Sequence, residues 1–280
     1  TTKMKIRKLI TTLLFLGGVI LLAYPNVNVL LSNHDQTIAV KKYNDKALHY
    51  DKAMVKKEID KAKVYNKSIL GTEVHDPFVP GSGVVIPDNY NDIMNVASGI
   101  MGTLEIPCID LNLPIYHGVA EKVIRKGVGH LRETPFPIGG KGNHTVLSTH
   151  RGLPEAKLFT DLDKMEIGDE FYIHIYNQVL AYKVDKIIVV KPNKTEYLKP
   201  IADEDHVTLL TCTPYGINSH RLLVRGIRTK YIPKHKAMIT KKTWPKEIII
   251  LLVLTGALVL MIGYKIVKKV RSRKNETKIS

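Results

Sequence analysis

"VTLLTCTPYGINSHRLLVRG", residues Val207–Gly226, consists of two apolar runs joined by a turn that contains Pro, Gly, Asn and Ser. Apolar, β-branched runs of this length predict two strands, and the turn residues predict a close connection between them. Cys212 ends the first run and Arg221 opens the second. If the two strands are antiparallel neighbours, the thiol and the guanidinium face each other across the base of the turn.

A cysteine nucleophile needs a neighbouring base or cation, because the thiolate is the reactive form and a free thiol has a pKa of about 8.5. His150 is the candidate base, since "HTVLSTHRG" carries it past the end of an apolar run into a turn. Arg221 could stabilise the oxyanion of a tetrahedral intermediate. Arg225 shares that face of the strand but lies about 13 Å further along, so Arg221 is the preferred candidate.

Each of these residues also has a simpler interpretation when taken alone. Cys212 could be a small buried hydrophobe, His150 a satisfied turn histidine and Arg221 a surface charge. These three residues alone therefore predict a β domain that could be a cysteine enzyme, and a binding module with an incidental cysteine stays open. A Cys212→Ala variant separates the two, because only the enzyme would lose its function.

Short apolar runs separated by turn residues fill residues 84–235. Residues 171–176, "FYIHIY", alternate apolar and polar positions, and β-branched residues are frequent in the other runs. These features predict a mainly β domain, a sandwich or a barrel, with short helices only in connections such as "AEKVIRKG" at residues 120–127.

The region before this domain has a helical pattern. Within residues 26–74, apolar residues recur at mostly three- or four-residue spacing among lysines and acids, which predicts one or two amphipathic helices packed on the β domain. They are Val40, Tyr43, Ala47, Met54, Ile59, Ala62, Tyr65 and Ile69. The helical period ends at "HDPFVPGSG", residues 75–83, which contains two prolines and two glycines.

Two apolar stretches without a charge lie near the ends of the chain, "LITTLLFLGGVILLAY" at Leu9–Tyr24 and "IIILLVLTGALVLMIGY" at Ile248–Tyr264. Both predict membrane-spanning helices. Basic residues precede the first stretch and follow the second, which predicts two cytoplasmic termini and an exported domain between them. The alternative for the first stretch is a cleaved signal peptide, but no clear small-x-small cleavage site follows it.

The chain has 42 Lys and Arg against 26 Asp and Glu, a formal charge of +16. Much of this excess flanks the apolar stretches and is explained by topology, and no nucleic-acid-binding motif accompanies it. The two cysteines lie in unrelated contexts, so no disulfide framework is expected, and Cys108 in "IPCIDLNLPIY" is interpreted as a buried small hydrophobe. No paired Cys or His spacing predicts a metal site, and no segment indicates an organic cofactor.

These segments resemble the sortases, membrane-anchored cysteine transpeptidases of Gram-positive bacteria. "TLLTC" resembles the family's TLxTC motif, "STHRG" its catalytic-histidine turn, and "SHRLLVRG" its arginine segment. The resemblance implies a sortase-type β-barrel in which Cys212, His150 and Arg221 are catalytic. Thr211, within the cysteine motif, is an expected substrate contact.

The similarity extends to the class C, or pilus-assembling, branch. "LNLPIYHG", "GNHTVLSTHRGLP", the helical preface and the second apolar stretch are all similar to that branch. "DPF", formed by Asp76, Pro77 and Phe78, resembles the class C lid, which implies that Asp76 pairs with Arg221 and that Phe78 covers the Cys212 thiol. Many lids carry Trp at the aromatic position, so Phe78 is a departure that could loosen the cover. The alternative is that this segment is only a linker.

The resemblance implies an enzyme that cleaves an LPxTG-like sorting signal of a pilin subunit between Thr and Gly. It then joins the acyl group to a lysine of another pilin, at the outer face of the membrane of a Gram-positive bacterium. The implied partners are pilins and the membrane, without nucleic acid or cofactor. Two further alternatives are a sortase that attaches proteins to peptidoglycan and a cysteine peptidase that uses water as acceptor.

The expected organisation follows from these boundaries: the catalytic barrel occupies 84–235, and the other segments are arranged around it. They are a cytoplasmic N-terminus (1–8), a membrane helix (9–25), the helical region (26–74), the lid (75–83), a basic linker (236–247), a second membrane helix (248–264) and a basic cytoplasmic tail (265–280).

Overall fold

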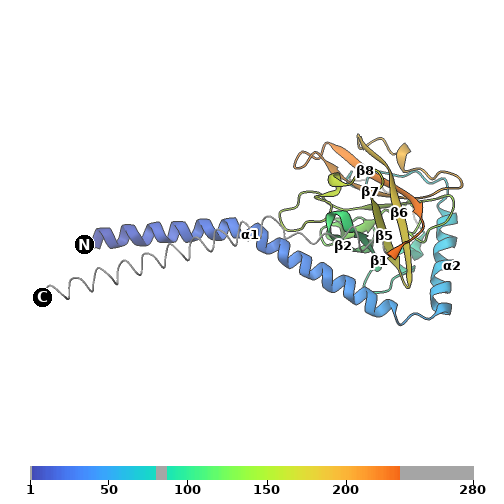
Figure 1. Cartoon of the computed structure of the whole chain (residues 1–280), viewed down its shortest axis with the longest axis horizontal. Helices are drawn as coiled ribbons and strands as arrows, with labels where there is room; N and C mark the ends of the chain where they lie inside the picture. The colour runs from blue at the N-terminus through green and yellow to red at the C-terminus, as the bar shows by residue number, and fades with distance from the viewer. Residues whose placement is uncertain (1, 80–86, 234–280) are drawn as a thin grey trace. The chain divides into compact units, whose positions relative to one another are not determined.

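The computed structural model describes residues 2–79 and 87–233 (Figure 1). The chain divides into two units, one made of residues 1–26 with 242–280 and the other of residues 27–241. The candidate residues all belong to the second unit.

The second unit contains a closed β-barrel with the strand order β1-β2-β3-β4-β7-β8-β6-β5. The strands are β1 (Ile100–Ile106), β2 (Leu111–His117), β3 (Val128–His130), β4 (Asn143–Ser148), β5 (Glu170–Ile175), β6 (Gln178–Val190), β7 (Asp205–Thr213) and β8 (His220–Thr229). The pairs β2–β3 and β4–β7 are parallel, and the other neighbours are antiparallel. The expectation of a mainly β domain is confirmed, as a barrel and not a sandwich.

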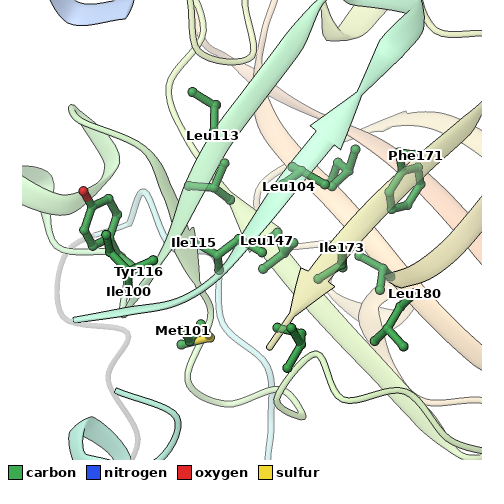
Figure 2. Close-up of a cluster of buried hydrophobic side chains, with 14 of the residues drawn as sticks. Ile100, Met101, Leu104, Leu113, Ile115, Tyr116, Leu147, Phe171, Ile173 and Leu180 are labelled. Carbon is green, nitrogen blue, oxygen red and sulfur yellow. The ribbon is translucent and has the colours of Figure 1, made fainter. Parts of the chain in front are cut away.

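Alternating side chains fill the barrel, because successive residues of a strand point to opposite faces of the sheet. Figure 2 shows Leu104, Ile115, Leu147 and Ile173, from β1, β2, β4 and β5, gathered in one cluster. All four are fully buried, and burial of one such side chain is worth roughly 1.5–3 kcal/mol. This core also holds β7, which carries the candidate cysteine, and β4, which the candidate histidine follows.

Three helices accompany the strands within the described residues. They are α1 (Thr2–Ala47), α2 (Lys52–Ser68) and α3 (Glu121–Ile124), with 3₁₀ turns η1 (Asp88–Asp92), η2 (Pro107–Ile109), η3 (Leu162–Lys164) and η4 (Glu196–Leu198). Asp51 caps α2 by accepting a hydrogen bond from the backbone N–H of Met54 at 2.8 Å. Tyr43 accepts a hydrogen bond from the backbone N–H of Tyr176, and Tyr65 donates one to the carbonyl of Arg132, both at 2.8 Å. The expected packing of the helical region on the β domain is confirmed.

No helix within residues 2–79 and 87–233 is long and apolar enough to cross a membrane. The stretch at Leu9–Tyr24, expected to be a separate membrane helix, is part of α1 (Thr2–Ala47), which contains Pro25. The stretch at Ile248–Tyr264, the basic linker and the basic tail lie outside the described residues.

The expectation for Cys108 is wrong. This cysteine is exposed and lies in η2, between β1 and β2. Pro107 has no backbone N–H to give to the strand ladder, so β1 ends at Ile106 and the chain turns before Cys108.

Candidate active site

The strands β7 and β8 bring the candidate cysteine and arginine together. They are antiparallel neighbours, and Cys212 is paired directly with Arg221 in the register, as the sequence predicts. On β7, Val207 and Leu209 pack in the barrel core, whereas Leu210 packs in a second apolar cluster with Phe78, so alternate side chains point to opposite faces of the sheet. Cys212 and Arg221 therefore share the outer face of the sheet at the end of the barrel where β7 and β8 are joined.

Arg221 is held by a carboxylate from outside the barrel. Its Nε donates to Oδ2 of Asp76 at 2.7 Å, and its Nη2 donates to Oδ1 at 3.1 Å. Its Nη1 also donates to the carbonyls of Asn218 and His220. The side chains of Arg221 and Asp76 are only 7% and 6% exposed, so this forked ion pair is shielded from water.

Phe78 lies between the candidate arginine and the candidate histidine. Its ring centroid is 5.1 Å from the guanidinium carbon of Arg221 and 5.9 Å from the ring centroid of His150. Oδ1 of Asp76 accepts a hydrogen bond from the backbone N–H of Phe78 at 2.8 Å, which tightens the turn through Pro77. The same ring packs on an apolar cluster of Leu131, Val146, Leu198, Leu210 and Leu223.

The thiol of Cys212 is buried, at 6% residue exposure. Burial raises its pKa, while Arg221 lowers it and Asp76 raises it, and the net pKa lies above the ordinary value. In this arrangement the carboxylate of Asp76 also neutralises the cation that would favour a thiolate. This arrangement therefore disfavours the thiolate of Cys212.

His150 follows β4 and is held by a residue that the sequence interpretation did not single out. Its Nε2 lies 3.0 Å from Oε2 of Glu121, at the start of α3. The sequence identified "AEKVIRKG" only as a short connecting helix. The signal that was missed is an acidic residue in the first turn of that helix, but nothing local connects it with a histidine 29 residues later.

Thr211 does not have the position that substrate binding requires. Its residue exposure is 0%, and its hydroxyl donates to the carbonyl of Thr149 at 2.8 Å. Because Cys212 faces outward, its neighbour Thr211 must face inward, and the expectation of a direct substrate contact is corrected. Its hydrogen bond joins the residue before Cys212 to the residue before His150.

Arg225, the alternative to Arg221, forms an ion pair with Asp185, away from the thiol. It is paired with Thr208 in the register and not with the cysteine. Its Nε donates to both oxygens of Asp185, at 3.2 and 3.1 Å, and its Nη2 also donates to this carboxylate. The geometry therefore leaves Arg221 as the arginine beside the thiol.

A cavity of about 230 Å³ lies further along the same face of the sheet. It is lined by Lys186, Ile188, Glu196, Tyr197, Lys199, Pro200, Ile201, Thr208, Leu223 and Arg225. Leu223 belongs both to this cavity and to the apolar cluster beneath Phe78, so the two features adjoin. Among residues 2–79 and 87–233, no group of His, Cys, Asp and Glu could hold a metal ion.

Comparison with known proteins places this geometry in context. The family model described as "Sortase domain" matches residues 104–229. The crystal structure of sortase C1 from Streptococcus agalactiae is 44% identical, with a TM-score of 0.64, and the match covers 70% of this chain and 96% of that one. For sortase C from Streptococcus pneumoniae the values are 42% identity, a TM-score of 0.64, and 69% and 97% coverage. Sortase A from Bacillus anthracis is 29% identical over 152 residues, which cover 53% of this chain and 70% of that protein.

Proposed function

The chain belongs to the sortase family of cysteine transpeptidases, and on that premise we propose that it is a pilus-assembling enzyme. It cleaves an LPxTG-like sorting signal of a pilin subunit between Thr and Gly and joins the new acyl group to a lysine of another pilin. The similar sortase C from S. pneumoniae is described in terms of its pilin substrate specificity. The observation that carries the proposal is the opposed pair Cys212 and Arg221 beneath Asp76 and Phe78.

The first step forms an acyl-enzyme. The thiol of Cys212 gives its proton to His150, and its Sγ attacks the carbonyl carbon of the threonine. Arg221 stabilises the negative charge that develops on the carbonyl oxygen. The bond between Thr and Gly then breaks, and the leaving amine takes a proton from His150. The product is a thioester to Cys212, and the glycine-containing tail departs.

The second step transfers the acyl group. A lysine amine attacks the thioester carbon and gives a proton to His150, and Sγ leaves as the thiolate. An isopeptide bond now joins two subunits, and the imidazolium of His150 returns its proton to the thiolate. An amine acceptor distinguishes this reaction from that of a cysteine peptidase, in which water resolves the thioester.

The segment Asp76–Phe78 acts as a lid. It neutralises Arg221 and packs against His150, so substrate must displace it before the first step. Such a cover protects a thiol from oxidation until substrate arrives. The departure from the Trp found in many lids makes the cover smaller, which favours opening.

We assign the enzyme to the outer face of the cell membrane of a Gram-positive bacterium. Support comes from the two uncharged stretches with their basic flanks and from exposed apolar side chains on α1, among them Leu14 and Leu21 at 73% and 75%. Proteolysis of intact cells tests the assignment, because a tag placed next to the barrel should be cleaved while tags at both termini are protected.

Mass spectrometry of the intact full chain tests the reaction. A variant carrying Asp76→Ala and Phe78→Ala, with its lid open, is incubated with an LPxTG peptide. The expected mass increase equals the acyl portion of the peptide, and it should be absent when Cys212→Ala is added. Addition of a pilin lysine peptide should then release the adduct as an isopeptide product.

Two results would contradict the proposal. A free thiol that forms no adduct across a panel of related motifs would argue against acyl transfer and favour a binding module. An adduct that is resolved by a peptidoglycan amine and not by pilin lysine would instead indicate a sortase that attaches proteins to the cell wall.

A further inference from the structure

A carboxylate contacts the histidine at its Nε2. Oε2 of Glu121 lies 3.0 Å from this atom. The side chain of His150 is 19% exposed, and that of Glu121 is 59% exposed. Partial burial raises the pKa of Glu121, but hydrogen bonds from Arg125 and His150 outweigh this effect, and the net pKa lies below the usual range. An ionised carboxylate can only accept, so Nε2 of His150 must be the donor.

Glu121 is itself oriented by a second contact. Nε of Arg125 donates to its Oε1 at 2.7 Å, one helical turn further along the chain. The two oxygens therefore have separate partners, one arginine and one histidine. Arg125 also approaches Glu155, whose Oε1 lies 3.6 Å from Nη1.

The segment that carries Glu121 is fastened to the residue before His150. The hydroxyl of Thr149 is within hydrogen-bond distance of two carbonyls at the end of this segment, at 2.7 Å from Ile124 and 2.8 Å from Gly127. Thr149 is fully buried, and its own carbonyl accepts the hydrogen bond of Thr211. The end of α3, the histidine turn and the cysteine strand are thus tied together through one buried threonine.

From this geometry we propose that Glu121 is a positioning residue for His150, an inference that rests on the proposed transpeptidase function. By accepting from Nε2 it fixes the ring orientation and the tautomer, and it leaves Nδ1 as the nitrogen that exchanges protons with the leaving and incoming amines. Its negative charge also stabilises the imidazolium that donates to the leaving amine.

The test compares Glu121→Gln with Glu155→Gln in the full chain with the open lid. Both variants remove one carboxylate that contacts Arg125, but only the first touches His150, so Glu155→Gln is a matched control. We expect Glu121→Gln to lower the rate of acyl-enzyme formation about tenfold near pH 7, with little change in KM. The alkaline limb of its pH–rate profile should move to lower pH, and Glu121→Asp should recover part of the rate. Rates and pH profiles that coincide for the two glutamine variants would overturn the proposal.

A second measurement keeps the inference separate from the proposed function. If no peptide acylates the open-lid parent, iodoacetamide can report the reactivity of Cys212 directly, in a Cys108→Ser background that removes the exposed thiol. Glu121→Gln removes the carboxylate that stabilises the imidazolium of His150, and the imidazolium in turn favours the thiolate. Alkylation of Cys212 near pH 7 should therefore be severalfold slower in Glu121→Gln than in Glu155→Gln. Equal alkylation rates for the two would overturn the positioning role even when the acceptor chemistry is unknown.

Discussion

Arg221 and Arg225 lie on the same strand, each with a carboxylate held in a fork of hydrogen bonds. The partner of Arg225 is Asp185, at a bulge in β6, the strand that pairs with β8 in the barrel. The partner of Arg221 is Asp76, which is 145 residues away in sequence and lies outside the barrel. Strand pairing keeps the first partner in place, whereas the second depends on a short segment. The Arg225–Asp185 pair thus lies within the paired strands of the barrel, whereas in the proposed mechanism the Arg221–Asp76 pair separates when the lid opens.

Burial sharpens this contrast. The side chains of the pair Arg221–Asp76 are 7% and 6% exposed, and those of Arg225–Asp185 are 19% and 24% exposed. A buried charge left without its partner is costly, so loss of Asp76 is tolerable only if the site opens to water or to substrate. In the proposed mechanism, the more deeply buried pair is thus the one that separates before substrate reaches Cys212.

The largest effect is expected from the two arginines themselves. Arg221→Ala should lower acyl-enzyme formation by about 10²–10³-fold, because it removes the donor for the developing oxyanion. Arg225→Ala should leave acylation within a few-fold but lower the free energy of unfolding by about 1–3 kcal/mol, since Asp185 loses its partner. Quenched-flow mass spectrometry and urea unfolding measure the two quantities. If both variants lost the same share of acylation rate, the assignment of Arg221 as the oxyanion donor and of Arg225 as a structural residue would be contradicted.

The two carboxylates provide the next comparison. Asp76→Ala should raise the alkylation rate of Cys212 about tenfold near pH 7, since it frees Arg221, removes a negative charge near the thiol and releases the lid. Asp185→Ala should leave this rate unchanged and lower stability instead. Alkylation is followed by intact mass in a Cys108→Ser background. If the lid stays closed without Asp76, Cys212 should be alkylated equally slowly in both variants, which would contradict the prediction.

Sequence reasoning found the parts of this site that depend on local geometry. A short turn between two strands fixes Cys212 opposite Arg221. Strand alternation also accounts for the inward position of Thr211, although the cysteine motif alone suggested a substrate contact there. Glu121 and Asp185 were missed, because their contacts depend on which distant elements pack together. The barrel order, with β4 parallel to β7, likewise depends on long-range pairing that periodicity does not report.

The pH dependence of Cys212 alkylation tests whether the lid controls the protonation of the thiol. Burial raises its pKa in the closed form, so the protonated thiol stabilises that form below the ordinary thiol pKa of about 8.5, and this stabilisation is lost as pH rises through the raised value. The pH at which alkylation of Cys212 reaches half its maximal rate should therefore be higher in the parent than in the variant with Asp76→Ala and Phe78→Ala. The difference between the alkylation rates of the two proteins should become smaller as pH rises. Coincident midpoints would show that the lid does not control the environment of the thiol.

The smallest expected effect concerns the aromatic residue of the lid. Phe78→Trp enlarges the ring over Arg221, and a cation–π contact is strongest with Trp, so the closed form should gain about 0.5–1 kcal/mol. Acylation should then slow about two- to fivefold, because substrate must displace a better-held cover. Val79→Trp is the matched control, since it adds the same ring at the next position, which is 44% exposed. If both tryptophans slow acylation equally, bulk in the segment matters more than the contact with Arg221, and the lid would be closed by its carboxylate alone.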